Sequence, residues 1–270
     1  MDWGRNFPHV RVWLALAILI AQVARADLSG VSGAPSYSAA GIVQAAAQTA
    51  GALAPNAIAT VYGTNLSFTT HALTSSDLDH GDLPLSLEGV TVYVNGIAAN
   101  LFYVSPGQIN FLVPYEITAS TATIYVNRRG TAGPPVKVVI ANAAPAFFQW
   151  NGNFAVAQHA DGTLISAAAP AQGGEVIVLF AAGLGRTSPD LSSGYVVQRA
   201  ATILYVSQLQ VLLNGAVCPA ASILYAGVTP GFAGLYQINL KLPDVLSANP
   251  EIRVSIGTQI SPEAVQLPSR

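Results

Sequence analysis

A strand pattern that occurs twice along the chain constrains the fold more than any other feature. Residues 107–114 read GQINFLVP, and residues 236–243 read YQINLKLP. Upstream of each, residues 92–96 (VYVNG) match residues 211–215 (VLLNG). The offset between matching positions grows from 119 residues at the upstream pair to 129 at the downstream pair. Because the loops differ in length while the strands keep their order, we predict two copies of one β domain.

The repeated strand alternates apolar and polar residues with a period of two, which fixes the two faces of its sheet. We expect one face to be buried, with Ile109, Phe111 and Val113 in the first copy and Ile238, Leu240 and Leu242 in the second. The opposite, outward face then carries Gln108 and Asn110 in the first copy, and Gln237, Asn239 and Lys241 in the second. A one-residue slip would turn each apolar set to water, so the register is tightly specified.

Each copy has an Asn-Gly pair between two β runs, at Asn95-Gly96 and Asn214-Gly215. Asn and Gly tolerate the positive φ angles that a two-residue hairpin turn requires. We therefore expect a tight hairpin at both places.

The N-terminal segment has the pattern of an export signal. Arg5 and Arg11 precede an apolar run at residues 12–23, and Ala24-Arg25-Ala26 is a small-x-small cleavage site. A run of 12 residues is shorter than the roughly 20 that a membrane helix needs, although an uncleaved N-terminal anchor is the alternative. We expect the mature chain to be secreted, periplasmic or at the cell surface.

These observations predict an all-β protein built from two tandem immunoglobulin-like β-sandwiches. The expected division is a signal peptide at 1–26, an Ala/Gly/Ser-rich leader at 27–52, a first sandwich at 53–142, a packed connector at 143–170 and a second sandwich at 171–267. The connector carries Phe147, Phe148 and Trp150, which are too many aromatic residues for a free linker. No long helix is expected in the mature chain.

Charge argues against nucleic acid as a partner. Without the signal the chain keeps 8 basic and 12 acidic residues, and its only lysines are Lys137 and Lys241. Binding to a duplex needs clustered Lys and Arg to displace phosphate counterions, and the one adjacent basic pair is Arg128-Arg129.

Cys218 is the only cysteine, so no disulfide can form within the chain. A lone cysteine in an exported protein can pair between chains. Its apolar surroundings favour the other interpretation, a small buried hydrophobic side chain.

A family resemblance rests on residues 103–116 (YVSPGQINFLVPYE), together with residues 181–185 and 225–239. These segments resemble an uncharacterised C-terminal domain family found in secreted proteins of acidobacteria of the Solibacter type, over about residues 40–266. Each copy also resembles, more loosely, the IPT/TIG immunoglobulin-like domain. The resemblance implies a secreted β-sandwich tandem and brings no catalytic residues. An acidic insertion at residues 75–82 departs from the family pattern.

That insertion is a weak candidate for a metal site. Asp77, Asp79 and Asp82 lie close together, and calcium requires six to eight oxygen ligands. Gly81 stands where a third alternating ligand would fall, so the EF-hand spacing fails. A transition-metal site with His80 is weaker still, because the second histidine, His71, is nine residues away.

Catalytic motifs are lacking in the sequence. No G-x-S-x-G elbow, zinc-protease or phosphate-loop motif occurs, although His71, His80 and His159 are possible general bases. A pair of carboxylates for glycoside cleavage would meet only in space, so the sequence leaves a secreted hydrolase as a remote alternative. We expect no enzyme and no cofactor.

Polysaccharide binding is the stronger alternative, because β-sandwich modules can present aromatic rings on which sugars stack. The candidate residues are Trp150 and the matched polar pairs Gln108/Asn110 and Gln237/Asn239. Those pairs can equally hold loop backbone by hydrogen bonds. The sequence therefore favours a secreted, non-enzymatic module for adhesion, surface display or spacing, with an unidentified protein or polysaccharide at the cell surface as its partner.

Overall fold

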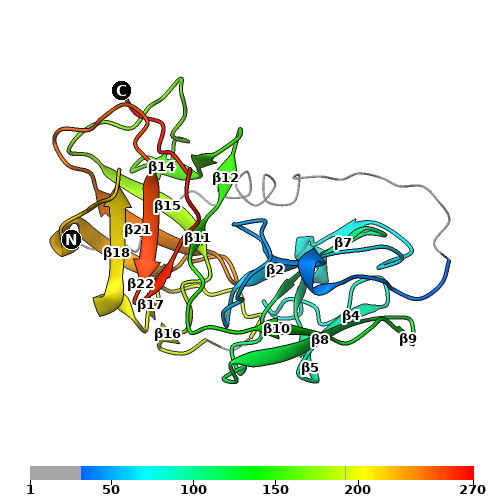
Figure 1. Cartoon of the computed structure of the whole chain (residues 1–270). Coiled ribbons are helices and arrows are strands. Elements are labelled where there is room, and N and C mark those ends of the chain that lie inside the picture. Colours follow the sequence, from blue (N-terminus) through cyan, green and yellow to red (C-terminus); the bar gives the residue numbers. More distant parts are fainter. Residues whose placement is uncertain (1–31, 192) are drawn as a thin grey trace.

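A computed structural model describes residues 32–191 and 193–270, and these form two β-sandwiches. The two sandwiches lie side by side, with the first in blue to green and the second in green to red (Figure 1). The predicted signal at residues 1–26 lies outside the described residues. The fold is all-β, as the sequence predicts. The helical segments among the described residues are the 3-10 turns η1 (Ala39–Gly41), η2 (Ser75–Asp77), η3 (Val206–Gln208) and η4 (Ala220–Ser222).

The first sandwich consists of two antiparallel five-stranded sheets. One has the strand order β1 (Ile42–Gln44), β2 (Ile58–Tyr62), β7 (Gln108–Leu112), β6 (Leu101–Val104) and β3 (His71–Ala72). The other has the order β10 (Val136–Val139), β8 (Thr121–Arg128), β4 (Val90–Val94) and β5 (Ile97–Ala99), with β9 (Thr131–Ala132) added to β8.

The second sandwich repeats this arrangement with a larger first sheet. Its order is β11 (Ala146–Phe147), β15 (Val176–Ala182), β21 (Tyr236–Lys241), β20 (Ile223–Val228), β17 (Thr202–Ile203) and β16 (Thr187–Ser188), with β14 (Ala157–His159) also on β15. The opposing sheet has the order β19 (Ala216–Val217), β18 (Leu209–Leu213), β22 (Ile252–Ile256) and β23 (Gln259–Ile260). A short hairpin of β12 (Gln149–Trp150) and β13 (Phe154–Ala155) lies beside them.

The predicted register is confirmed in both copies. Ile109, Phe111 and Val113 are fully buried in the core of the first sandwich, and Ile238, Leu240 and Leu242 are buried in the core of the second. The two repeated strands occupy equivalent places, since β7 pairs with β2 and β6 while β21 pairs with β15 and β20. Each sandwich therefore has its own core, to which the repeated strand contributes its apolar face: β7 in the first sandwich and β21 in the second.

Both predicted Asn-Gly hairpins are present. Asn95 and Gly96 have φ angles of 49° and 81°, and Asn214 and Gly215 have 47° and 78°. Each asparagine Oδ1 also accepts a backbone N–H hydrogen bond, at 2.7 Å from Thr123 in β8 and at 2.9 Å from Glu251, the residue before β22. Because these two contacts are equivalent, they align β8 with β22 residue by residue.

Two segments extend beyond the strands expected for the sandwiches. Strand β1 comes from the expected leader at 27–52, and it pairs with β2. Strands β11 and β14 come from the expected connector at 143–170, and both pair with β15. These strands of the expected connector are thus part of the larger sheet of the second sandwich. Within the described part of the chain, no helix has the length and apolar character needed to cross a membrane.

Candidate functional site

The junction between the sandwiches is a continuous apolar cluster to which both contribute. From the first sandwich it includes Ile58 on β2, Leu112 on β7 and Phe102 on β6. From the second it includes Val178 and Phe180 on β15, with further contributions from Ala146, Phe148, Val156, Ala182, Ala233 and Leu235. These side chains are buried. Separating the sandwiches would expose them to water, which opposes motion at the junction.

A backbone bridge adds directional contacts to the apolar ones. The N–H of Leu83 donates to the carbonyl of Gly194 at 2.9 Å, and the N–H of Val196 donates to the carbonyl of Gly81 at 2.9 Å. Asp82 and Tyr195 form the antiparallel bridge between them. The C-terminal end of the acidic insertion is therefore hydrogen-bonded to the second sandwich.

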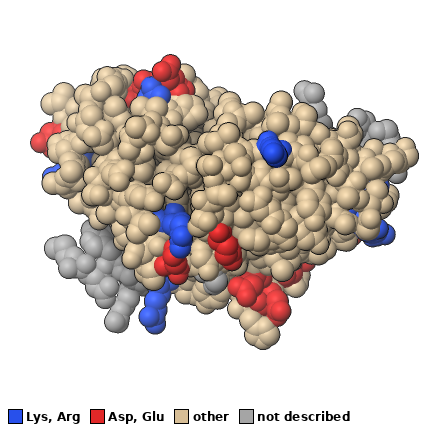
Figure 2. Space-filling model, turned by 60° about the horizontal axis from the view of Figure 1, so that its bottom comes forward, with Lys and Arg blue, Asp and Glu red and all other residues tan. Residues whose placement is uncertain are grey.

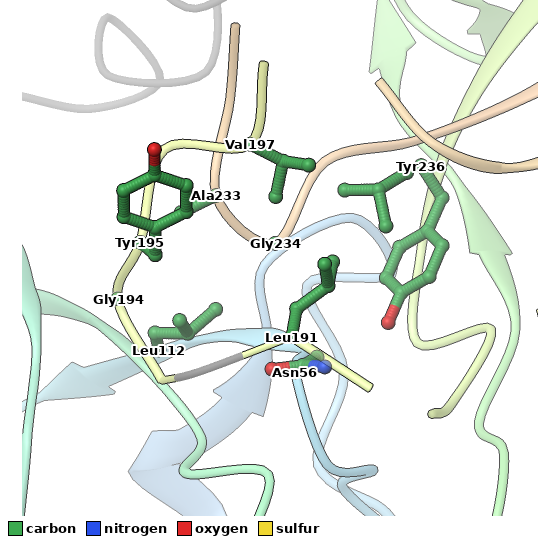
Figure 3. A pocket seen from close by; sticks show the side chains of 10 residues that line it. Asn56, Leu112, Leu191, Gly194, Tyr195, Val197, Ala233, Gly234 and Tyr236 are labelled. Atoms are coloured by element: carbon green, nitrogen blue, oxygen red, sulfur yellow. The ribbon is translucent and has the colours of Figure 1, made fainter. Parts of the chain in front are cut away.

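Glycine brings the two backbones close together at the junction. Gly234 has a φ of +71°, and a Cβ there would lie 2.4 Å from Leu112 Cδ1, 2.9 Å from Ile58 Cγ1 and 3.2 Å from the Asn56 carbonyl oxygen. Figure 3 shows Gly234 between Leu112 and Tyr236, with Asn56 near the phenol. The crevice that these residues line has a volume of about 10 Å³. That is room for at most about one water molecule, so the site is a packed contact.

Polar groups at this crevice are paired across the junction. The Tyr236 hydroxyl from β21 donates to the carbonyl of Gly185 and also bonds the side chain of Asn56 from the first sandwich. Burial raises the pKa of Tyr236 far above its ordinary value, and the bond with Asn56 opposes this only in part. Nearby, the Ser193 hydroxyl accepts from the N–H of Tyr115 at 3.1 Å and donates to Glu116 at 2.7 Å.

Gln108, Asn110 and Gln237 are buried, which corrects the prediction that they lie on an outward face. Gln108, Asn110 and Gln237 are only 6, 3 and 8% exposed, and Asn239 is half-buried. The reason is that their sheet faces are the faces on which the sandwiches pack. Asn110 and Gln108 share a face of β7 with Leu112, while Gln237 lies directly opposite Phe180 and Asn239 opposite Val178. The sequence of a single copy contains no signal of this packing.

These amides bind one another rather than the loop backbone suggested by the sequence. Gln108 Nε2 donates to Asn110 Oδ1 at 2.9 Å, and the Thr60 hydroxyl donates to the same oxygen at 3.1 Å. In the second copy, Gln237 Nε2 donates to Asn239 Oδ1 at 3.0 Å. The pairs satisfy buried polar atoms, and this accounts for their presence in both copies.

Trp150, the other predicted sugar-binding residue, lies on β12 and packs against the shared cluster. Its indole Nε1 is buried and has no hydrogen-bond partner among the described residues. The ring is therefore partly buried and packs against the junction.

The three aspartates proposed for a metal are not gathered around one point. The Asp77 carboxylate accepts from the backbone N–H and hydroxyl of Thr74, both at 2.7 Å, and from His71 at 3.0 Å. Asp79 is exposed, and its Oδ1 lies 2.6 Å from Nδ1 of the neighbouring His80. Across residues 32–191 and 193–270, no group of three or more His, Cys, Asp or Glu side chains could hold a metal ion.

The histidines proposed as general bases are bound to acceptors. His71 has one ring nitrogen 3.0 Å from Asp77 and the other 3.0 Å from Glu88, and only the protonated imidazole can donate to both carboxylates. The bond with Asp77 is the main cause that raises the pKa of His71. His159 similarly contacts Glu175 at 2.9 Å and the carbonyl of Ala169 at 3.2 Å. Burial lowers the pKa of His159, but the bonds to Glu175 and Ala169 outweigh this and raise it.

A groove that the sequence does not reveal lies at one end of the second sandwich, with a volume of about 330 Å³. Its walls include Val217, Pro243, Leu246 and the exposed Val245, with Lys241 at one side. Cys218 also lines it and is buried, which confirms the sequence-based interpretation, and burial raises the pKa of its thiol. The groove joins residues from three loops, so no single motif could predict it.

Comparison with known proteins gives solved structures alone. No family model and no curated protein matches the chain, and the acidobacterial resemblance stays a prediction. A surface glycan-binding protein of Prevotella bryantii is similar at 14% identity and a TM-score of 0.28, over 88% of this chain and 43% of that one. The plexin A4 extracellular region is similar at 10% identity and a TM-score of 0.29, over 93% of this chain and 20% of that one. Domains 5–6 of the S-layer protein SbsC are similar at 9% identity and a TM-score of 0.27, over 87% of this chain and 99% of that one. The chain thus spans less than half the length of the first two, and likenesses at these scores carry no inference about function.

Proposed function

We propose that this chain is a secreted, non-enzymatic module whose two sandwiches form one rigid body, and that it serves adhesion, surface display or spacing. The observation that carries the proposal is the junction. A shared apolar cluster, a backbone bridge and a glycine contact oppose rotation about the connector. Two domains joined by a free linker would swing independently, whereas a packed pair holds whatever it carries at a fixed distance and angle.

The surface supports the same role. Charged residues are few and scattered over the face shown in Figure 2, which is mostly uncharged. That face offers no concentrated field of one sign to steer a charged substrate. The histidines that could act as bases instead tie segments together, His71 by way of Asp77 and Glu88, and His159 by way of Glu175.

Distances between spin labels test the rigidity. In a Cys218→Ala background, labels would be placed at the exposed strand positions Val139 in the first sandwich and Leu224 in the second. We expect one narrow distance distribution. A second pair within the first sandwich, at Ile97 and Val139, sets the width that the labels themselves contribute. A distribution between sandwiches that is much broader than this control would overturn the proposal.

The non-enzymatic part has its own test. The purified mature chain would be assayed against ester, peptide and glycoside substrates, and we expect no turnover above a heat-denatured control. Activity that disappears on substitution of a single Ser, Asp or Glu would contradict the proposal, even if the rigid geometry were confirmed.

A further inference from the structure

Two tyrosines stack on the sheet of the first sandwich that faces away from the junction. Tyr93 on β4 and Tyr125 on β8 are directly opposite one another, with ring centroids 4.8 Å apart and ring planes inclined by 15°. Their neighbours along each strand, such as Val92, Val94 and Ile124, point into the core. By the alternation of a strand, the tyrosines therefore lie on the outer face.

From this face we propose that the chain binds a neutral polysaccharide, with the Tyr93–Tyr125 pair as its platform. The proposal goes beyond the spacing role and does not depend on it. The junction lies on the outer face of the β1–β2–β7–β6–β3 sheet, and the core of the first sandwich separates that sheet from this one. Figure 1 shows β4, β5 and β8 on the side of the first sandwich away from β2 and β7.

The chemistry of the face fits a sugar better than a charged partner. Neither phenol hydroxyl is hydrogen-bonded within the described part of the chain, so both can donate to and accept from a ligand. The same face carries the hydroxyls of Thr91, Thr121 and Thr123, the amide of Asn127 and a single charge, on Lys137. Sugars offer many hydroxyls and apolar C–H faces, and aromatic rings among neutral hydrogen-bonding groups match both.

Access to the pair is open on the side of the sheet edge. Ala98 on β5 lies opposite Tyr93, and β5 is the last strand of that sheet. The side chain between Tyr93 and the edge of the sheet is therefore only the methyl group of Ala98. A polysaccharide could therefore run across β5 and contact Tyr93 without displacing a larger residue.

The second sandwich shows that the aromatic pair is not required by the fold. The equivalent positions are Leu212 on β18 and Arg253 on β22, which are also directly opposite one another. The Asn95 and Asn214 side-chain bonds to Thr123 and Glu251 establish this equivalence. Cross-strand aromatic pairs do stabilise sheets, but the same sheet forms here with a leucine and an arginine. The pair is thus a feature of the first copy alone.

Affinity electrophoresis of the full chain tests the proposal, in gels that contain soluble starch, mixed-linkage β-glucan, arabinoxylan or galactomannan. We expect retardation in at least one polysaccharide. Tyr93→Ala and Tyr125→Ala should each weaken binding by up to about tenfold, given the energy of one aromatic contact. Leu212→Ala, the matched change in the second copy, should leave retardation unchanged.

A double variant guards against loss of folding. Tyr93→Leu with Tyr125→Leu removes both rings and keeps apolar side chains, of the kind that Leu212 supplies at the position equivalent to Tyr93. This variant should keep the thermal unfolding midpoint close to that of the wild type and lose retardation. No retardation by the wild type in any gel would overturn the proposal, as would retardation that both alanine variants retain. Retardation abolished by concentrated NaCl would show a charge-driven contact and would also overturn it. None of these outcomes alters the spin-label test of the junction.

Discussion

Gly234→Ala tests how closely the two sandwiches approach. The new Cβ would lie 2.4 Å from Leu112 Cδ1 and 2.9 Å from Ile58 Cγ1, and both of those side chains are buried in the shared cluster. Crowding of this kind costs about 1–3 kcal/mol because a packed core cannot yield freely. The substitution also places a Cβ at a φ of +71°, which costs roughly 1–2 kcal/mol by itself. We therefore expect the free energy of unfolding to fall by about 2–5 kcal/mol.

Gly231→Ala is the matched control in the same loop. Gly231 has a φ of +88°, but a Cβ there would meet nothing within 4 Å. This variant should lose only the free energy that a Cβ costs at a positive φ, about 1–2 kcal/mol. Urea titration followed by tryptophan fluorescence gives both values, since unfolding free energy varies linearly with denaturant. Equal losses in the two variants would refute the close approach at Gly234.

Unfolding titrations of four other substitutions give further tests. Phe111→Ala should cost about 2–5 kcal/mol because it opens a cavity in a closed β core, and an unchanged midpoint would mean that the register is wrong. Asn110→Ala should cost about 1–3 kcal/mol because it leaves two buried donors, on Thr60 and Gln108, without their shared acceptor. Asn239→Ala should cost less, since it is half-buried and a single donor loses its partner, so the reverse order would contradict this account. The pKa of His71 is raised in the folded protein. Its ion pairs therefore contribute fully to the free energy of unfolding below the pKa of the unfolded state, near 6.5, and this contribution declines as the pH rises through the folded-state pKa. His71→Gln should remove that decline, and a parallel pH dependence in both proteins would argue against it.

The sequence predicts the parts of the structure that depend on one copy at a time. Alternation placed Phe111 and Leu240 in their cores, because burial of one face leaves a single acceptable register. The Asn95 turn followed from the positive φ angles that a two-residue hairpin needs. Recurrence of these features at drifting offsets was sufficient to predict a tandem of sandwiches.

What the sequence does not predict is how the copies meet. Gln108 and Asn110 look like an exposed polar face because their neighbours on β7 are apolar, and nothing local indicates that a second sandwich covers them. The bridge between Leu83 and Gly194 joins two loops that are more than a hundred residues apart. Contacts of that range depend on packing of complete domains, which leaves no periodic pattern in either segment.

Residual dipolar couplings measured on the backbone amides of the intact chain test the rigid junction most directly. If the two sandwiches form one body, couplings from strands of the first, such as β4 and β8, and of the second, such as β18 and β22, will fit a single alignment tensor. Two tensors of different magnitude or orientation would mean that the sandwiches move independently, and the proposed function would then be wrong.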